Sequence, residues 1–529
     1  MHMRTIVDNK ATVEQLLSSA LLIDENREVI YDGNRRLTYH ELQTEATWLA
    51  SGLQQLGVEK GDRVAVCLPN WHEFIVVLFS LSKIGAILIP LNIRYRTDEV
   101  EYILKDSGAK AVFVSEQVDE NNHIKMFSDL KNHVSSLEHI VPVRCEQDSL
   151  LSYNGLLETG KKNELLQEMP ITSEDVFTIL YTSGTTGKPK GVMLLHRNVV
   201  TVARTASAKM QCTHEDVFLI PVPAFHVMGI MFIIRTVYAQ ARLVLMEKFK
   251  AGEALSLIEN ERVTIHPGVP TMFILELNHS SFSSYDLSSL RTGELAAAPC
   301  PVEIVRKIKT NMGCNILVAY GLTETSANLT ITDFNDSDVI QSETVGRAID
   351  GVELKVVDDD RQPVESGTVG ELACRSVGLM KGYYNLPEQT SEAVDSEGWF
   401  YTGDLATIDN DGYVRIVGRK KDMIIRGGYN IYPREIEELL FQHPSVLEGA
   451  VIGLPDSVLG EISCAVVILK EGFEVNEEEI KTYLKDKLVH YKVPDKIIFT
   501  RKLPMTASGK ILKTELQSQL KAELKSELR

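Results

Sequence analysis

Helical and strand patterns alternate through the first two hundred residues, and this alternation constrains the fold more than any other feature of the chain. Thr38 and Glu41 have the spacing of a capping box, and apolar residues follow at helical intervals until Gly57. Short runs rich in Val and Ile then alternate with helical patterns; the expected elements are strands at 63–68, 86–90 and 111–115 and helices at 71–83 and 98–105. Strands separated by helices form parallel βαβ units packed in layers. The sequence therefore predicts an α/β fold.

The pattern changes in the last third of the chain. Residues 344–418 contain short strand patterns with frequent Gly, Asp and Pro turns, which predicts a small β-rich subdomain. After Arg419 a basic cluster is followed by a unit of about a hundred residues, a usual size for a separate domain. We predict a large multi-layer N-terminal domain over 1–419 and a compact α+β C-terminal domain over 420–529, joined by a hinge. The elements expected in this second domain are helices at 434–441 and 477–488 and strands at 446–452, 463–469 and 496–500.

Charge and composition exclude several classes of partner. The 529 residues include 73 acidic and 55 basic side chains, a formal charge of −18, whereas nucleic acids and anionic membranes are bound by basic faces. No apolar run is long enough to span a bilayer, and the N-terminus lacks the pattern of a secretory signal. The seven cysteines are scattered without a C-x-x-C pair, as expected of reduced thiols. We expect a cytoplasmic enzyme with no nucleic-acid partner and no integral membrane segment; the oligomeric state, a homodimer included, is left open.

Residues 181–191 form a glycine-rich loop directly after an apolar strand pattern at 176–180, and they read Tyr-Thr-Ser-Gly-Thr-Thr-Gly-Lys-Pro-Lys-Gly. Glycines allow close backbone approach, and the hydroxyl, ammonium and amide donors suit phosphate oxygens. The loop is not a Walker A motif, because two residues rather than four separate Gly184 from Gly187 and Pro189 follows Lys188. A phosphate-binding loop is the favoured interpretation, and a flexible surface hairpin is the alternative.

The glycine-rich loop resembles the signature of the adenylate-forming superfamily, which includes acyl-CoA synthetases, aryl-CoA ligases, luciferases and the adenylation domains of peptide synthetases. Six further motifs of this family follow in the same order, at 225–229, 320–324, 401–404, 418–422, 427–437 and 504–510. Each string is short, but their order makes the set specific. The resemblance implies a two-step reaction: a carboxylate attacks the α-phosphate of ATP to give an acyl-adenylate and pyrophosphate, and a thiol then displaces AMP.

The resemblance also implies roles for individual residues. Positive charge must lie between the carboxylate and the α-phosphate, and Lys510 matches the catalytic lysine of the family. Glu324 and Thr186 match the ligands of Mg²⁺, which prefers oxygen donors. His226 matches a histidine near the carboxylate end of the acid pocket, although a lone histidine in an apolar setting is more often a core residue. The implied ATP- or AMP-binding residues are Thr182, Ser183, Gly184, Thr185, Thr186, Gly187, Lys188, Tyr320, Thr323, Asp404, Arg419 and Lys510.

A basic cluster at 415–426 lies on the expected domain boundary. It holds five basic residues and one acidic residue, and outside this family context it would be a solvated linker. The resemblance implies that Lys421 is the hinge, so that rotation of the small domain would withdraw Lys510 after adenylation and admit the thiol. The residues implied to line the CoA tunnel are Gly427, Gly428 and Tyr429.

The expected acid pocket is mostly apolar, which suits an acyl or aryl tail and disfavours an amino acid, whose ammonium would require a buried carboxylate. The chain has Ala296, Ala297 and Ala298 where the family usually has a turn rich in Ser and Gly, and the added methyl groups would shorten or narrow the pocket floor. The expected pocket residues are His226, Val227, Met228, Gly229, Val269, Ala296, Ala298 and Gly321.

Together these features predict an ATP- and Mg²⁺-dependent acid–CoA ligase, with CoA as co-substrate and a medium- or long-chain fatty acid as the carboxylic acid. Ligation of an aryl acid to CoA, or adenylation of an acid for transfer to a carrier protein, is an alternative; the carrier reading is secondary because no fused carrier domain is evident. A non-catalytic nucleotide-binding homologue is a third reading. The presence of Lys510, Glu324 and Asp404 counts against it.

Overall fold

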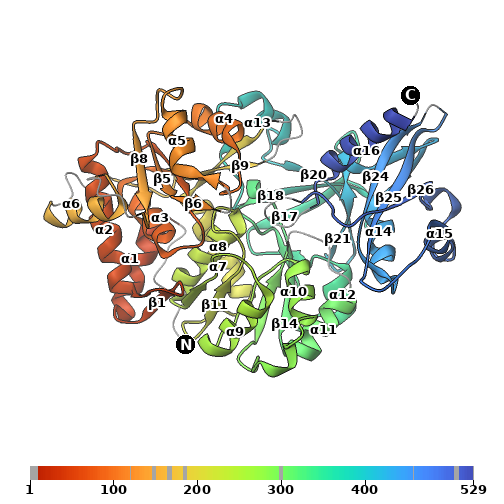
Figure 1. Cartoon of the computed structure of the whole chain (residues 1–529), viewed down its shortest axis with the longest axis horizontal. Coiled ribbons are helices and arrows are strands. Elements are labelled where there is room, and N and C mark those ends of the chain that lie inside the picture. The colour runs from red at the N-terminus through yellow and green to blue at the C-terminus, as the bar shows by residue number, and fades with distance from the viewer. Residues whose placement is uncertain are drawn as a thin grey trace.

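The computed structural model describes residues 10–118, 121–145, 151–163, 170–182, 188–296, 302–456, 458–505 and 511–527. Figure 1 shows a large body formed by the first four hundred residues, with the C-terminal elements, coloured blue, on one side of it. Within the described ranges no helix is both long enough and apolar enough to cross a membrane.

A seven-stranded sheet with the order β19-β10-β9-β4-β3-β5-β8 forms the first layer of the large body. Strands β9, β4, β3, β5 and β8 are parallel neighbours, which confirms the predicted α/β class. Thr38 and Glu41 form the expected capping box at the start of helix α2. The bounds are β3 Arg63–Cys67, β4 Ile87–Pro90, β5 Ala111–Ser115, β8 His139–Val143, β9 Val176–Thr182, β10 Lys190–Leu195, β19 Gly382–Tyr383, α1 Val13–Asp24, α2 Tyr39–Gln55, α3 His72–Ile84, α4 Thr97–Ser107, α5 His123–Lys131 and α6 Tyr153–Lys162.

Two four-stranded sheets, β11-β12-β1-β2 and β13-β14-β15-β16, continue the large body. Ile265 links them by bridges to Phe218 and Thr292. Helix α8 is apolar on nearly every face and is buried in the core, as expected of a helix without an amphipathic stripe. The bounds are β1 Glu28–Tyr31, β2 Arg36–Thr38, β11 Val217–Ile220, β12 Arg242–Leu245, β13 Thr292–Leu295, β14 Asn315–Tyr320, β15 Thr330–Ile331, β16 Arg347–Ala348, α7 His196–Lys209, α8 Val227–Ala239, α9 Ala251–Glu261, α10 Pro270–Leu277, α11 Val302–Met312 and α12 Asp338–Glu343.

The region expected to be rich in β-structure contains an antiparallel sheet of the order β17-β18-β20-β21. The next strand, β22, belongs instead to the C-terminal sheet β23-β22-β25-β24, which β26 joins at β25. Between the two sheets, Lys420–Asp422 form a short 3₁₀ helix, η3. The bounds are β17 Val352–Val357, β18 Gly370–Ser376, β20 Phe400–Ile408, β21 Val414–Arg419, β22 Ile424–Arg426, β23 Tyr429–Ile431, β24 Val446–Asp456, β25 Gly460–Leu469, β26 Lys496–Phe499, α13 Pro387–Ala393, α14 Pro433–Gln442, α15 Glu477–Lys485 and α16 Lys513–Glu527.

Two C-terminal strands are longer than the sequence predicts. Strands β24 and β25 extend toward each other and pair as far as Asp456 opposite Gly460. Gly460 has a φ of +79°, a conformation that glycine adopts without strain and that lets the chain reverse tightly. The strand signal was weak there because Pro455 and Gly460 usually indicate a loop.

Candidate active site

The glycine-rich loop connects two antiparallel strands, since Thr182 of β9 pairs with Lys190 of β10. Ser183, Gly184, Thr185, Thr186 and Gly187 lie outside the described residues. Both lysines at the end of the loop lie over aromatic rings: Lys188 Nζ is 5.7 Å from the ring centroid of Tyr102, and Lys190 Nζ is 5.0 Å from that of Tyr383. The loop therefore starts and ends on two paired strands of the seven-stranded sheet, and the two lysines lie where it joins β10.

Glu324 lies in the 3₁₀ helix η2, which spans Thr323–Thr325, and it is tied to the same hairpin. Tyr383 Oη donates a hydrogen bond to Glu324 Oε1 at 3.0 Å, and the neighbour of Tyr383 across the sheet is Val192 of β10. Burial and the Glu324 carboxylate raise the pKa of Tyr383, so the phenol remains a donor at neutral pH. The sequence did not reveal Tyr383 as a partner of the predicted site residue Glu324, because no motif marks it.

The structure brings together three predicted nucleotide-binding residues from two sheets. Tyr320 Oη donates to Asp404 Oδ2 at 2.6 Å, and Arg419 Nε lies 2.9 Å from Asp404 Oδ1. The Asp404 side chain is only 5% exposed, whereas that of Arg419 is 48% exposed. Burial and the adjacent Asp404 carboxylate raise the pKa of Tyr320. These contacts fix the orientation of a buried carboxylate and leave a guanidinium accessible beside it.

His226 is the N-cap of helix α8, and its Nδ1 accepts a hydrogen bond from Met228 N at 3.3 Å. The following Val227 and Met228 are buried. Packing favours glycine at position 229, because a Cβ there would lie 2.2 Å from the carbonyl oxygen of Pro223. These contacts orient the start of the helix, and the roles of the four residues in an acid pocket stay a prediction.

The remaining predicted pocket residues come from three further segments. Val269 is the buried N-cap of α10, and Ala296 follows β13 and packs against the main core cluster. Gly321 permits a close backbone contact, since a Cβ would lie 2.0 Å from the carbonyl oxygen of Ala327. Ala298 lies outside the described residues.

Most of the basic residues in the cluster at 415–426 form ion pairs with carboxylates. Arg415 pairs with Glu343, Arg419 with Asp404, Lys420 with Asp359 and Glu371, and Arg426 with Asp495. Carboxylates distant in the sequence thus offset much of the charge expected at the boundary. Lys421 lies between these pairs, in η3.

The residues predicted to line the CoA tunnel form the turn between β22 and β23. Gly427 and Gly428 have φ values of +56° and +86°, which a larger residue would adopt only with strain. Tyr429 is 59% exposed and stacks on Tyr491 with ring centroids 4.8 Å apart. The contacts described for this turn lie within the C-terminal domain. Lys510 lies outside the described residues.

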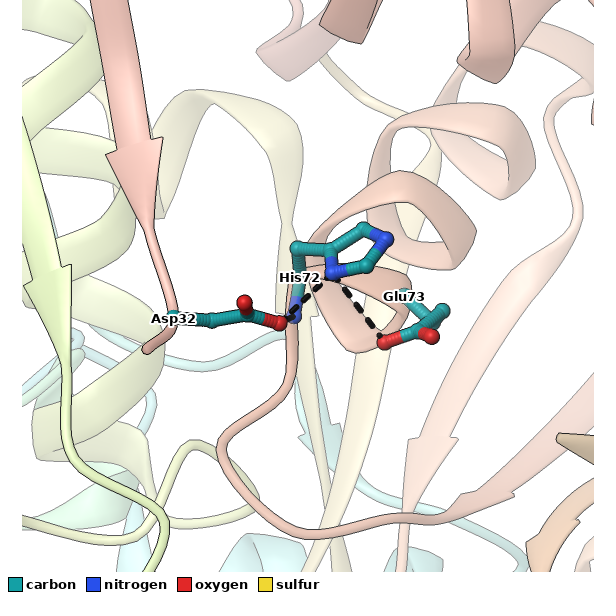
Figure 2. Close-up of side chains that lie close together, drawn as sticks. All are labelled: Asp32, His72 and Glu73. Atoms are coloured by element: carbon teal, nitrogen blue, oxygen red, sulfur yellow. Dashed lines mark hydrogen bonds and ion pairs between the residues drawn. The ribbon is translucent and has the colours of Figure 1, made fainter. Parts of the chain in front are cut away.

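A second cluster of titratable groups lies near the start of α3 (Figure 2). His72 Nδ1 lies 2.6 Å from Asp32 Oδ2 and 3.4 Å from Glu73 Oε2, and all three side chains are buried. A histidine and two carboxylates could hold a metal ion, but Arg144 already provides a cation: its guanidinium contacts Asp32 and donates to Glu73 at 2.7 Å. The cluster is therefore best interpreted as an ion-pair network that ties β1, α3 and the end of β8 together.

This network predicts a stability effect. Burial alone would raise the pKa of Asp32, but the hydrogen bond and charge of His72 and the charge of Arg144 outweigh it and hold that pKa well below its usual range. Replacing Asp32 by Asn should therefore lower the free energy of unfolding by about 3 kcal/mol, because it removes the buried carboxylate that contacts both His72 and Arg144. The pKa of Asp32 is lower in the folded chain than in the unfolded chain. The loss of unfolding free energy in Asp32→Asn should therefore be largest at neutral pH and should shrink as the pH falls through about 4.

Denaturant unfolding of both chains at several pH values measures this effect. Asp286→Asn is the matched control, since Asp286 pairs with Arg262 on the surface and its loss should change stability little. A difference between Asp32→Asn and the unmodified chain that grows as the pH falls would contradict the assigned network.

Comparison with known proteins identifies the family. The family model of AMP-binding enzymes matches residues 23–384, and that of the AMP-binding enzyme C-terminal domain matches 435–510. YngI of Bacillus subtilis (strain 168), provisionally named an acyl-CoA synthetase, is 39% identical over 96% of this chain and 96% of its own. The medium-chain fatty-acid–CoA ligase of Escherichia coli (strain K12) is 36% identical, covering 91% of this chain and 86% of its own.

A solved structure of another CoA ligase has a similar fold. The crystal structure of the anthranilate CoA ligase AuaEII in complex with anthranoyl-AMP superposes with a TM-score of 0.90 and 28% identity, over 98% of this chain and 99% of that one. The chain belongs to the AMP-binding enzyme family. Its activity is the ATP-dependent ligation of a carboxylic acid to CoA.

Proposed function

We propose that the chain joins a medium- or long-chain fatty acid to CoA, with Mg²⁺ accompanying ATP. One observation carries most of this proposal: Tyr320, Asp404 and Arg419 converge from separate strands, as a ribose and adenine site requires. The apolar surroundings of α8 favour an apolar tail, and the E. coli relative is named a medium-chain fatty-acid–CoA ligase.

In the first step the chain must bring two anions together. Asp404 would accept hydrogen bonds from the ribose hydroxyls, Tyr320 would stack on adenine, and Thr323 would contact the phosphates. Glu324 offers the hard oxygen donor that Mg²⁺ prefers, held in place by Tyr383. When bound there, the ion would neutralise phosphate charge. Lys510 would then stabilise the negative charge that develops as the carboxylate attacks the α-phosphate and pyrophosphate leaves.

In the second step the CoA thiol attacks the acyl carbonyl, and AMP departs. Lys510 would have to leave the site, and we propose that the small domain rotates about Lys421 in η3. The turn at Gly427 and Gly428 would then face the large domain and let the pantetheine chain approach the backbone closely. The positive φ values of both glycines support a turn adapted to such an approach.

Ligation of an aromatic acid is the second candidate. It is favoured by the resemblance in fold to a ligase named for anthranilate. An aromatic acid is short and flat, whereas a fatty acid needs a long channel, so the two substrate classes would give different activity profiles.

The deciding experiment measures acid-dependent exchange of labelled pyrophosphate into ATP, followed by CoA-thioester formation, across unbranched aliphatic acids and a set of aromatic acids. We expect the highest kcat/KM for an aliphatic acid of medium or greater length, and loss of exchange when Mg²⁺ is chelated. Higher kcat/KM for aromatic acids would support the second candidate. Exchange without thioester formation would indicate another acceptor, such as a carrier protein.

A further inference from the structure

Tyr383 and Glu324 share a hydrogen bond that engages only one of the two carboxylate oxygens. Tyr383 Oη donates to Glu324 Oε1 at 3.0 Å, whereas Glu324 Oε2 makes no hydrogen bond or ion pair within the part of the chain that the structure describes. The Tyr383 side chain is buried in the main core cluster, and Glu324 is partly exposed. The pair therefore leaves Oε2 as the carboxylate oxygen that is available to a ligand.

The backbone around Glu324 is held by the same segment that carries Tyr383. Met380 N donates to the carbonyl oxygen of Glu324 at 2.7 Å. Two residues further along η2, Ser326 Oγ donates to the carbonyl oxygen of Gly378 at 2.8 Å. One short segment thus fixes both the backbone and the side chain of Glu324.

This segment is anchored in turn on strand β10. Tyr383 lies opposite Val192 in the sheet, and Tyr384 N donates to the carbonyl oxygen of Gly191 at 2.7 Å. Lys190 Nζ lies 5.0 Å from the ring centroid of Tyr383, within the range of a cation–π contact. Because its backbone and its ring are both held, the hydroxyl of Tyr383 has little freedom to move away from the carboxylate.

The number of oxygens that a carboxylate offers affects Mg²⁺ and Ca²⁺ differently. Mg²⁺ requires near-ideal octahedral geometry at about 2.0–2.1 Å, whereas the larger Ca²⁺ tolerates irregular geometry and accepts carboxylates through one oxygen or both. A hydrogen bond to a metal-binding carboxylate also fixes its orientation, and the loss of such a partner usually lowers metal affinity by about 10–100-fold. A carboxylate limited to one oxygen therefore suits Mg²⁺ better than Ca²⁺.

We propose that Tyr383 is a positioning residue that limits Glu324 to one metal-binding oxygen, Oε2, and thereby favours Mg²⁺ over Ca²⁺ beside ATP. This inference rests on the proposed function, because it assumes that Glu324 is a ligand of the ion. To bind an ion through both oxygens, Glu324 would have to give up the hydrogen bond from Tyr383. Without the phenol hydroxyl, the carboxylate could turn and offer both oxygens.

The test compares the unmodified enzyme with Tyr383→Phe, which removes the hydroxyl and keeps the ring beside Lys190. The probe is α,β-methylene-ATP, in which the bond broken during adenylation is replaced by a stable one. Calorimetry measures its dissociation constant with saturating Mg²⁺ and again with saturating Ca²⁺. We expect the ratio of the Ca²⁺ constant to the Mg²⁺ constant to fall by about 10-fold in Tyr383→Phe. An unchanged ratio would overturn the inference.

Tyr413→Phe is the matched control, since Tyr413 Oη donates to Asp336 Oδ1 at 2.6 Å, away from the predicted site residues. This variant should keep the ratio of the unmodified enzyme. An equal fall in the control would overturn the inference, because the loss of any phenol–carboxylate hydrogen bond would then have the same effect. Both constants come from one preparation of each variant, so a partly unfolded fraction would not change their ratio.

A third variant, Glu324→Gln, separates the inference from the proposed function. If it binds the Mg²⁺ complex of the analogue as tightly as the unmodified enzyme does, Glu324 does not hold the ion. That part of the proposed function then fails, and the inference fails with it. If Glu324→Gln weakens this binding by about 10-fold or more while Tyr383→Phe keeps the unmodified ratio, the inference alone is wrong.

Discussion

Replacing Lys510 with alanine is expected to lower acid-dependent pyrophosphate exchange by about 10²–10³-fold, the usual loss when one charge that stabilises a developing anion is removed. The carboxylate and the α-phosphate repel each other, and among the predicted site residues Lys510 is the cation assigned between them. The second step should suffer much less. Thioester formation from a supplied acyl-adenylate and CoA should therefore continue, because AMP leaves without help from this lysine.

Lys502→Ala is the matched control, since Lys502 is an exposed lysine of the same C-terminal segment. It should leave both steps unchanged. If Lys510→Ala keeps its exchange rate, or loses both half-reactions to the same extent, Lys510 is not the residue that stabilises the first transition state. Equal melting temperatures of the two variants would exclude a folding defect as the cause.

Replacing Asp404 with asparagine is expected to lower kcat/KM for ATP by about 10²-fold or more. Hydrogen bonds to a charged group contribute about 1.5–3 kcal/mol each, and the two ribose hydroxyls would donate to this carboxylate together. Asparagine keeps the shape of the side chain but removes the charge that pairs with Arg419. The main effect should be on KM for ATP, with KM for the acid nearly unchanged.

The control for this second prediction is Asp411→Asn, in the exposed turn between β20 and β21. It removes a carboxylate from the same subdomain but not from the site, so its kinetics should match those of the unmodified enzyme. Comparable increases in KM for ATP and for the acid in Asp404→Asn would contradict a role in binding the ribose. They would indicate instead that Asp404 only holds Tyr320 and the surrounding strands in place.

Local sequence patterns were sufficient to predict the α/β fold class of the chain. Apolar residues at helical spacing and short Val- and Ile-rich runs predict which segments bury a face, and the capping box of Thr38 and Glu41 predicts where α2 begins. The order of the seven motifs predicts the family that the comparisons confirm. These signals are readable because each depends on neighbours within a few residues or on a contiguous string.

Contacts between side chains that are distant in the sequence could not be predicted from these local patterns. Tyr383 contacts Glu324 across 59 residues, Tyr320 contacts Asp404 across 84, and Arg235 contacts Asn328 across 93. The basic run at 415–426 indicated free positive charge, yet most of its members pair with carboxylates elsewhere in the fold.

The sequence by itself thus determined the layers of this protein, its family and the chemistry of its motifs. Only the tertiary structure decided which motif residues meet, which charges neutralise one another and which polar side chains pair in the core. The physical reason is that periodicity records which face of an element is buried, whereas a pairing depends on how separate elements are stacked and rotated against each other. A charged residue has the same local signature whether it ends in water or, like Arg235, in the centre of the molecule.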